Sequence, residues 1–500
     1  MIFIRPAILL LTLFFTPLLV LPQGLVIGNN ANFIVSSGIK MTLNNANCLV
    51  QSDDIGTGAL VDKNANGNID ISGTATIERY TLRGNSTTYL TGLWHYFSSP
   101  VTNQAIDAVY MTANDVSTAA GYYDFFLWEE PTSTWRQYAG PNFTDTEFVP
   151  GRGYAIIFDS DGARTFEGTS GTKINTGNIN ISVYKTTGIA KEAYNLLGNP
   201  YPSPISNSDF LTANSAVIEG TMYFWSQKSD WLFDSDNYSY WNGAGSVGNG
   251  VQVPDDYTAV GQAFMVQALA DNQTVTFTNA MRNPGSPVFL KNEALIARLW
   301  LNVTDKRQNY NETLIAFPED ASNGFDNAYD AHKLLNTGVL LLYSRLVDDD
   351  GTEYAIQGLP ELNGEVVTVP LGMHAQINGQ HKISLSDMEH FEPDVIVVLE
   401  DKLTGKFTDL LEKQVYTFGV AQSGYLSDRF LLHFNAPMSD EEANEDCHIV
   451  IYSYENAIYV KNDTGIQLDG EIAVYNMLGQ LIYKKDILQS TMGRYNAPDR

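Results

Sequence analysis

The sequence predicts an all-β, multidomain protein in which duplicated β modules are followed by a β-sandwich and a small β domain at the C-terminus. Aromatic residues make up 12% of the 500 residues, with 27 Tyr and 24 Phe, and they recur in short runs between turn residues that include 40 Gly. Aromatic and β-branched residues favour strands, whereas Gly and Asn favour turns. Long helical patterns are scarce, and residues 206–214 and 439–444 are the short helical candidates.

The charge of the chain excludes some partners. The sequence has 57 acidic and 29 basic residues, which gives a formal net charge of −28. Such a surface repels nucleic acid and anionic lipid, so we expect neither as a partner, although it can recruit divalent cations. The two cysteines, Cys48 and Cys447, are too few for a disulfide framework or a thiolate zinc site. A single bridge between them would require the two terminal domains to touch.

Residues 1–24 have the pattern of a signal peptide. Arg5 precedes the largely apolar run 7–20, which is too short to span a bilayer comfortably. The alternative is an N-terminal membrane anchor. No other run approaches the roughly 20 apolar residues of a membrane helix, so we expect an exported protein that is not an integral membrane protein.

The middle of the chain repeats itself. Residues 25–91 form a region of short predicted strands, and residues 92–190 and 191–285 then share motifs at a period of about 100 residues. Each copy has an apolar strand that ends in proline, a Trp-bearing strand, a Gly-led apolar strand and a Thr-Phe strand. We therefore predict a duplicated module in which Trp128 matches Trp225 and Gly153 matches Gly261.

The tryptophans of the repeat allow two interpretations. On strands they usually cover a sheet face, but they can also form a stacking platform for the sugar rings of surface glycans. The platform candidates are Trp128, Trp135, Trp225, Trp231 and Trp241. Trp241 is the best single candidate, because its neighbours in Tyr238-Ser-Tyr-Trp-Asn-Gly look like loop residues.

Residues 286–437 predict a β-sandwich, because short strands alternate with turns over this length. An acidic run, residues 438–446, then forms a solvated linker to a last domain at 447–500.

One loop has the spacing of a calcium site. Asp62, Asn64, Asn66 and Asp70 place oxygen ligands at positions one, three, five and nine, with a glycine at six. Position twelve is Gly73, where the calcium loop calls for a glutamate. The alternative is an Asn-Gly hairpin turn, which the same residues favour.

We do not expect an enzyme. The sequence lacks a Gly-x-Ser-x-Gly elbow, a His-Glu-x-x-His motif and a paired cysteine and histidine signature. Its seven histidines are scattered, and scattered histidines are mostly structural.

The C-terminal stretch carries the most specific motif. Two alternating strands flank a turn that includes Asn476 and Gly479, and the wording Val474-Tyr-Asn-Met-Leu-Gly-Gln480 resembles the C-terminal sorting domain of bacterial type IX secretion cargo. The resemblance covers roughly residues 447–500 and rests on Val474, Tyr475, Asn476, Gly479 and Gln480. It implies an immunoglobulin-like sorting domain, the type IX secretion machinery as a partner, and delivery through the periplasm to the outer surface of a Gram-negative cell.

Known sorting domains of this type (the type A class) usually end with a further strand pair and a basic end. We therefore expect that this domain is incomplete and that the 500-residue form stays periplasmic. The expected function is a structural or adhesive cell-surface protein, secreted or attached to the cell, whose partners are other surface proteins or glycans. The alternative is a carbohydrate-binding accessory protein of a secreted glycan-utilisation system. No cofactor beyond calcium is expected.

Overall fold

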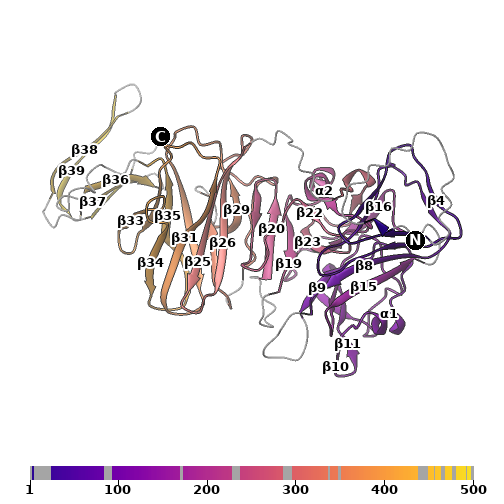
Figure 1. Ribbon diagram of the computed structural model, residues 1–500. Coiled ribbons are helices and arrows are strands. Elements are labelled where there is room, and N and C mark those ends of the chain that lie inside the picture. Colours follow the sequence, from indigo (N-terminus) through magenta and orange to yellow (C-terminus); the bar gives the residue numbers. More distant parts are fainter. Residues whose placement is uncertain are drawn as a thin grey trace.

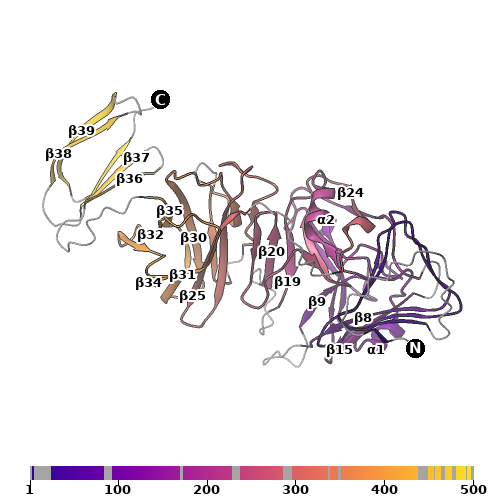
Figure 2. The same cartoon turned by 45° about the horizontal axis from the view of Figure 1, so that its top comes forward.

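A computed structural model describes residues 24–83, 93–168, 173–227, 237–284, 295–335, 338–346 and 351–436 in full. Outside these ranges it gives strands at Phe3–Ile4 and after residue 448. The described chain is built almost entirely of strands, which confirms the predicted all-β, multidomain fold. The parts follow one another in chain order along an elongated molecule (Figures 1 and 2). Among the described residues, no helix has the length and apolar character needed to cross a membrane.

The N-terminal region stacks its strands in parallel. The strands are β1 (Phe3–Ile4), β2 (Leu25–Ile27), β3 (Asn32–Val35), β4 (Met41–Leu43), β5 (Cys48–Val50), β6 (Ala59–Asp62), β7 (Ile69–Ile71) and β8 (Ala75–Thr81). Strand β5 lies between β2 and β8, β6 pairs with β3, and β7 pairs with β4, all in parallel. This pattern forms successive rungs of a parallel β-helix. The hairpin that we considered for residues 62–70 is therefore wrong, because β6 and β7 pair with other strands.

Cys48 lies inside this β-helix. Its side chain is buried, and burial raises the pKa of the thiol to about 12, so the thiol is protonated at neutral pH. Cys447 lies outside the described residues, and the bridge between the two cysteines stays untested.

The first repeat forms a compact sheet with a short helix. Its elements are β9 (Trp94–Phe97), α1 (Ala108–Ala113), β10 (Thr118–Ala119), β11 (Tyr122–Tyr123), β12 (Phe125–Glu129), η1 (Glu130–Thr132), β13 (Thr134–Gln137), β14 (Tyr154–Ile157) and β15 (Gly162–Gly168). The sheet order is β13-β12-β14-β9, and β15 pairs with β8 of the preceding region. We call β8–β15 module 1.

The second repeat has the same architecture. Its elements are β16 (Ile179–Val183), β17 (Tyr194–Gly198), β18 (Ile205–Ser206), α2 (Asn207–Asn214), β19 (Met222–Trp225), β20 (Tyr238–Asn242), β21 (Gly245–Val247), β22 (Tyr257–Thr258), β23 (Ala263–Gln267), β24 (Gln273–Phe277) and η3 (Asn279–Met281). Its sheet runs β21-β20-β19-β23-β17, and β24 pairs with β16. We call β16–β24 module 2. The order β20-β19-β23-β17 matches β13-β12-β14-β9 of module 1, as expected for a duplication, and β21 is an added edge strand.

The residue register fixes which positions are equivalent. Phe126 pairs with Ala155 in module 1, and Tyr223 pairs with Met265 in module 2. Counting two residues onward from Phe126 and from Tyr223 places Trp128 over Trp225, as predicted.

The predicted match of Gly153 with Gly261 is wrong by two residues. Gly151 and Gly261 both have positive φ, 85° and 68°, and each lies in the same turn before β14 or β23. Gly153 instead corresponds to Ala263. The sequence Gly-Arg-Gly in module 1 offered two glycines, and only backbone conformation tells them apart.

Each module has a capped helix. Ser206 caps α2 by accepting a hydrogen bond from the amide of Asp209, and Asp107 caps α1 through the amide of Tyr110. The predicted helix at 206–214 is confirmed, whereas α1 was not predicted. The other candidate, residues 439–444, lies outside the described residues.

The third part is one curved sheet around a common core. Its strands are β25 (Ala297–Asp305), β26 (Tyr310–Phe317), β27 (Ala331–His332), β28 (Leu341–Ser344), β29 (Tyr354–Gly358), β30 (Val367–Ala375), β31 (Gly379–Glu389), β32 (Val397–Asp401), β33 (Lys406–Asp409), β34 (Val415–Val420) and β35 (Gly424–Phe434). The order runs from β33 and β32 at one end to β31 and β34 at the other. Residues from β25, β26, β28, β30, β31, β32, β34 and β35 share one buried apolar cluster.

The two ends of this sheet meet. Tyr416 of β34 donates a hydrogen bond of 2.8 Å to Asp401 of β32, and Arg429 of β35 forms a buried ion pair with Asp401 at 2.7 Å. Burial acts to raise the pKa of Asp401, but the hydrogen bonds from Arg429 and Tyr416 outweigh it and hold the pKa below its ordinary value. The sheet is therefore nearly closed into a barrel.

The last strands lie beyond the curved sheet. They are β36 (Ile449–Tyr454), β37 (Ala457–Asn462), β38 (Leu468–Tyr475), β39 (Leu481–Ser490) and β40 (Met492–Asn496). Strands β36, β37 and β40 form one sheet, and β38 pairs with β39 in an antiparallel ladder (Figure 2).

Candidate functional site

The two modules contact each other reciprocally through their backbones. The amide of Ser98 donates to the carbonyl of Gly261 at 3.0 Å, and the amide of Gly198 donates to the carbonyl of Gly151 at 3.0 Å. Ser98 is the counterpart of Gly198, and Gly151 is the counterpart of Gly261. Each module therefore gives the other the same contact, which is the signature of a two-fold relationship.

Residues at the centre of this contact face their own counterparts. A Cβ on Gly198 would lie 2.3 Å from the Cβ of Ser98, and a Cβ on Gly153 would lie 2.8 Å from the Cβ of Ala263. A residue meets its own counterpart only where a two-fold axis passes. Modules 1 and 2 thus pair about an internal two-fold axis.

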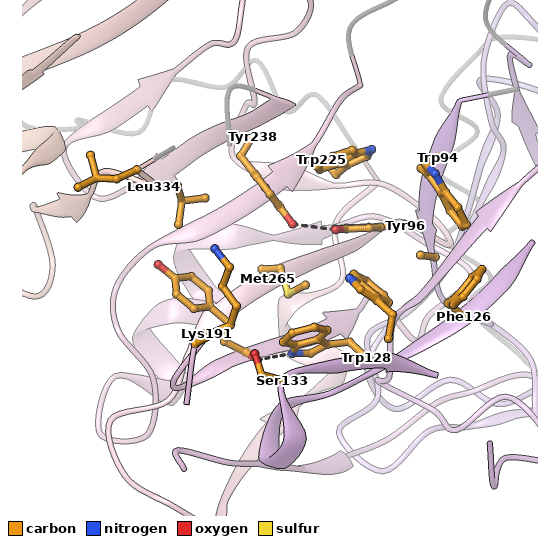
Figure 3. Close-up of a pocket in the computed structure, with 15 residues that line it drawn as sticks. Trp94, Tyr96, Phe126, Trp128, Ser133, Lys191, Trp225, Tyr238, Met265 and Leu334 are labelled. Carbon is orange, nitrogen blue, oxygen red and sulfur yellow. Dashed lines mark hydrogen bonds between the residues drawn. The ribbon is translucent and has the colours of Figure 1, made fainter. Parts of the chain in front are cut away.

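A deep cleft opens between the two modules. Its volume is about 590 Å³, and one segment before β28 contributes Leu334 and Leu335 to its rim. The other lining residues come from the two modules: Trp94, Tyr96, Phe126, Trp128, Ser133, Trp135, Ala155, Ala190, Lys191, Tyr194, Trp225, Tyr238 and Met265 (Figure 3). We call this the aromatic cleft. Four of the seven tryptophans of the chain line it.

The cleft is lined by matched positions of the two modules. Four equivalent pairs of described residues contribute to it: Trp94 with Tyr194, Trp128 with Trp225, Trp135 with Tyr238, and Ala155 with Met265. The internal two-fold arrangement therefore brings two aromatic faces of the same kind together.

The rings of the cleft form a connected series. Trp128 lies 5.2 Å from Trp135, Tyr96 lies 5.9 Å from Trp135 and 5.5 Å from Trp225, and Trp225 lies 5.0 Å from Tyr238, measured between ring centroids. The angle between neighbouring ring planes ranges from 24° for Tyr96 and Trp225 to 76° for Trp225 and Tyr238. All except the buried Tyr96 are only partly buried, so their faces remain available to a ligand.

The described lining residues bring few polar groups into the cleft. The hydroxyls of Tyr96 and Tyr238 bond each other at 2.7 Å, and the indole N–H of Trp128 donates to the carbonyl of Tyr194 at 2.6 Å (Figure 3). The indole N–H of Trp225 is buried and has no hydrogen-bond partner. A buried donor without an acceptor is costly, and a ligand that supplies an acceptor removes that cost.

The tyrosine pair stays protonated. Burial raises the pKa of Tyr238 to about 12 and raises the pKa of Tyr96 well above its ordinary value. Because only one hydroxyl hydrogen lies between the two oxygens, the other hydroxyl hydrogen can donate to a ligand.

Trp241 is not the exposed platform that its sequence context predicted. It lies within β20, is only 9% exposed and packs in the core of module 2. The pattern Tyr-Ser-Tyr-Trp is a strand rather than a loop, and its alternation places Trp241 on the core side. Trp231 lies outside the described residues. The tryptophans that do line a cavity are Trp128, Trp135 and Trp225, together with Trp94, which the sequence reasoning did not single out.

The predicted calcium loop holds a network of hydrogen bonds. Asp62 is fully buried, and its carboxylate accepts from the amide and side chain of Asn64 at 3.0 and 2.8 Å, from the amide of Asn68 at 2.8 Å and from the hydroxyl of Thr176 at 3.0 Å. Both carboxylate oxygens therefore already accept hydrogen bonds that fix the turn.

The remaining predicted ligands do not join Asp62. Asp70 is exposed and pairs with Lys40 at 3.6 Å, and the side chain of Asn66 is exposed. Within the fully described ranges, no three His, Cys, Asp or Glu side chains gather as a metal site would require. Calcium binding at this turn remains a prediction.

The sorting motif lies partly within the described strands. Val474 pairs with Tyr483 and Tyr475 with Leu481, so a strand pair forms where it was predicted. Asn476 and Gly479 lie outside the described residues, and Gln480 is exposed at the start of the returning chain.

Comparison with known proteins adds one relative and one family. The chain is 23% identical to the minor fimbrium subunit Mfa5 of Porphyromonas gingivalis over 501 aligned residues, which cover 93% of this chain and 38% of that protein. This chain thus spans well under half the length of the relative. No solved structure matches this chain. Residues 19–434 match a family described as a domain of unknown function (DUF8693), and because this match spans most of the chain, the protein belongs to that family.

Proposed function

We propose that the protein is a structural or adhesive component of the bacterial cell surface and that the aromatic cleft is its binding site. The observation that carries this proposal is the similarity to a minor fimbrium subunit over 93% of the chain. The name of that relative describes a part of a fimbrium, and a comparable place on the cell surface is proposed here.

The geometry of the modules supports a binding role. The aromatic cleft exposes part of several large rings, and apolar surface of this kind usually marks an interaction site. Tandem modules joined by backbone hydrogen bonds hold such a site rigidly, which suits a protein that bears load or contacts a partner.

The proposed route to the surface uses both ends of the chain. A signal peptide at residues 1–24 would direct the chain into the periplasm, and the domain at 447–500 would engage the type IX secretion machinery. The antiparallel pairing of β38 with β39 supports the strand-turn-strand expected of the sorting motif.

Antibody labelling of intact cells that produce the native protein tests the location. We expect labelling of intact cells without lysis. A Gly479→Ala/Gln480→Ala variant, changed in the sorting motif, should lose surface labelling. Lys484→Ala is the matched control, because it changes an exposed residue of the same strand pair, which forms an ion pair with Glu471, and leaves the sorting motif intact.

The outcomes separate the two parts of the proposal. Label that reaches the protein only after lysis would contradict a surface function. Surface labelling that persists in the Gly479→Ala/Gln480→Ala variant would contradict the type IX route and leave the surface function standing.

A further inference from the structure

We propose that the aromatic cleft binds an extended, proline-rich peptide segment of a partner protein. This inference deepens the proposed adhesive function by naming the chemistry that the cleft accepts. It rests on the lining of the cleft, on one unpartnered donor, on the arrangement of the rings and on the charge of the chain.

The lining disfavours a glycan. Among the lining residues that the structure describes, Ser133 and Lys191 are, apart from the aromatic residues, the only ones with polar side chains. A sugar ring carries hydroxyls on most of its carbons, and each hydroxyl buried without a partner costs about 1–3 kcal/mol. The stacking energy of the rings would be offset by these unmatched hydroxyls.

Several of the described polar groups can donate hydrogen bonds, which disfavours a pure hydrocarbon. The buried N–H of Trp225 has no acceptor, and the pair of Tyr96 and Tyr238 has one hydroxyl hydrogen to donate. A polyproline II peptide makes no internal hydrogen bonds, so its backbone carbonyls are free to accept. Such a peptide supplies acceptors at intervals and otherwise presents apolar rings.

The rings are arranged to receive apolar rings edge to face. Trp128 and Trp135 meet at 59°, and Trp225 and Tyr238 meet at 76°, so each pair forms an angled slot instead of a flat stack. Proline rings dock in aromatic-lined grooves of this kind, and the extended conformation is already formed before binding, which lowers the entropic cost.

The charge of the chain favours basic residues beside the prolines. The formal net charge is −28, so a peptide with lysine or arginine flanks is attracted at long range and an acidic peptide is repelled. Binding should therefore weaken as salt is added.

The test uses the purified full chain and a fluorescent oligoproline peptide flanked by lysines. Binding is measured by fluorescence anisotropy and by quenching of the intrinsic tryptophan signal. We expect Trp225→Phe, which keeps a ring but removes the N–H, to weaken binding about tenfold. Trp135→Ala, which removes a slot wall, should weaken it at least as much.

Trp300→Phe is the matched control. It removes an indole N–H that donates to the carbonyl of Ser246 at 2.7 Å, outside the lining of the cleft, so affinity should stay unchanged. Thermal melting of each variant shows that it is folded. A second peptide, in which alanine replaces proline, should bind more weakly than the oligoproline peptide.

Several results would overturn the inference. These are no binding of the peptide by the folded protein, equal affinity in Trp225→Phe, Trp135→Ala and wild type, and displacement of the peptide by soluble oligosaccharides or by an alkyl detergent at lower concentration. None of them bears on surface labelling. A surface-labelled protein that ignores the peptide refutes only this inference, whereas binding by a protein that never reaches the surface refutes only the proposed function.

Discussion

Asn114 and Asn214 occupy the same position in the two modules and make the same hydrogen bonds. Each side-chain nitrogen donates to the carbonyl four residues earlier, at the end of α1 or α2, and also to Thr165 or Thr276 of the closing strand. Each side-chain oxygen accepts from the amide of that threonine, at 2.5 and 2.8 Å. One buried amide thus ties the helix to the sheet in both modules.

We expect Asn114→Ala and Asn214→Ala each to lower the free energy of unfolding by about 2–3 kcal/mol. Both substitutions remove the hydrogen bonds that the part-buried backbone groups of Thr165 or Thr276 make with the asparagine. Urea denaturation of the full chain measures the change. Asn178→Ala, at an exposed position before β16, is the control and should change stability little. A loss in only one of the two modules would contradict the equivalence.

Gly151 and Gly261, the equivalent glycines of the reciprocal backbone contact, should respond alike to substitution. A Cβ on Gly151 would lie 3.3 Å from the ring of Phe277, and one on Gly261 would lie 3.8 Å from the ring of Phe166, the counterpart of Phe277. Both glycines have positive φ, so we expect Gly151→Ala and Gly261→Ala each to cost about 1–2 kcal/mol. Gly419→Ala, which meets no atom and has no positive φ, should cost nothing in the same urea denaturation. Unequal losses in the free energy of unfolding for Gly151→Ala and Gly261→Ala would count against the two-fold arrangement.

The turn that holds Asp62 gives a third prediction. Because the buried carboxylate accepts hydrogen bonds from Asn64, Asn68 and Thr176, Asp62→Ala should lower the free energy of unfolding by about 3 kcal/mol or more, with or without calcium. Thermal melting with and without added calcium measures both effects.

The control for this turn is Asp54→Ala, which removes an exposed carboxylate nearby. A rise in melting temperature on adding calcium to the wild type, absent from an Asp62→Ala/Asp70→Ala variant, would instead establish the calcium site that the spacing predicts.

Asp330 makes stability depend on pH. Burial raises its pKa to about 7, against backbone hydrogen bonds from Asp326 and Gly358 that act to lower it. In the unfolded chain the pKa is about 4. Between about pH 4 and about pH 7 the carboxyl is therefore protonated in the folded state but ionised in the unfolded state. Its contribution to stability is full below about pH 4 and is lost as the pH rises toward 7.

Between about pH 5 and about pH 8 we expect this group to lower the free energy of unfolding by roughly 3 kcal/mol. Urea denaturation at both pH values, in wild type and Asp330→Asn, isolates it, because the variant cannot ionise. Asp394→Asn, at an exposed position, serves as control. If Asp330→Asn keeps the full pH dependence, the assignment to Asp330 is wrong.

The duplication was predictable because the same short sequence motifs recur in the same order in both repeats. Proline after an apolar strand, a tryptophan on the next strand and a Gly-led strand recur in order, and the equivalence of Trp128 and Trp225 needed only this order. The error at Gly153 came from a tripeptide with two glycines, where the sequence does not show which backbone is left-handed.

Other features depend on contacts between distant residues and had no local signal. The parallel β-helix pairs β3 with β6 and β4 with β7, and short apolar strands look the same whether they pair with a neighbour or with the next rung. The burial of Trp241 followed from the direction in which β20 faces its core. The aromatic cleft required the docking of the two modules, which no motif encodes.

The internal two-fold arrangement has a consequence for how the site can evolve. In a homodimer, one gene change alters both sides of the axis, and assembly depends on subunit concentration. Here the two halves are covalently joined, so they are always paired and each can change alone. Tyr96 in one half faces the cleft where its counterpart is Leu196, and Trp135 is matched by Tyr238. The backbone arrangement is therefore two-fold symmetric, but the side chains that line the cleft differ between its two halves. A peptide bound across the cleft can therefore be recognised in one direction of the chain.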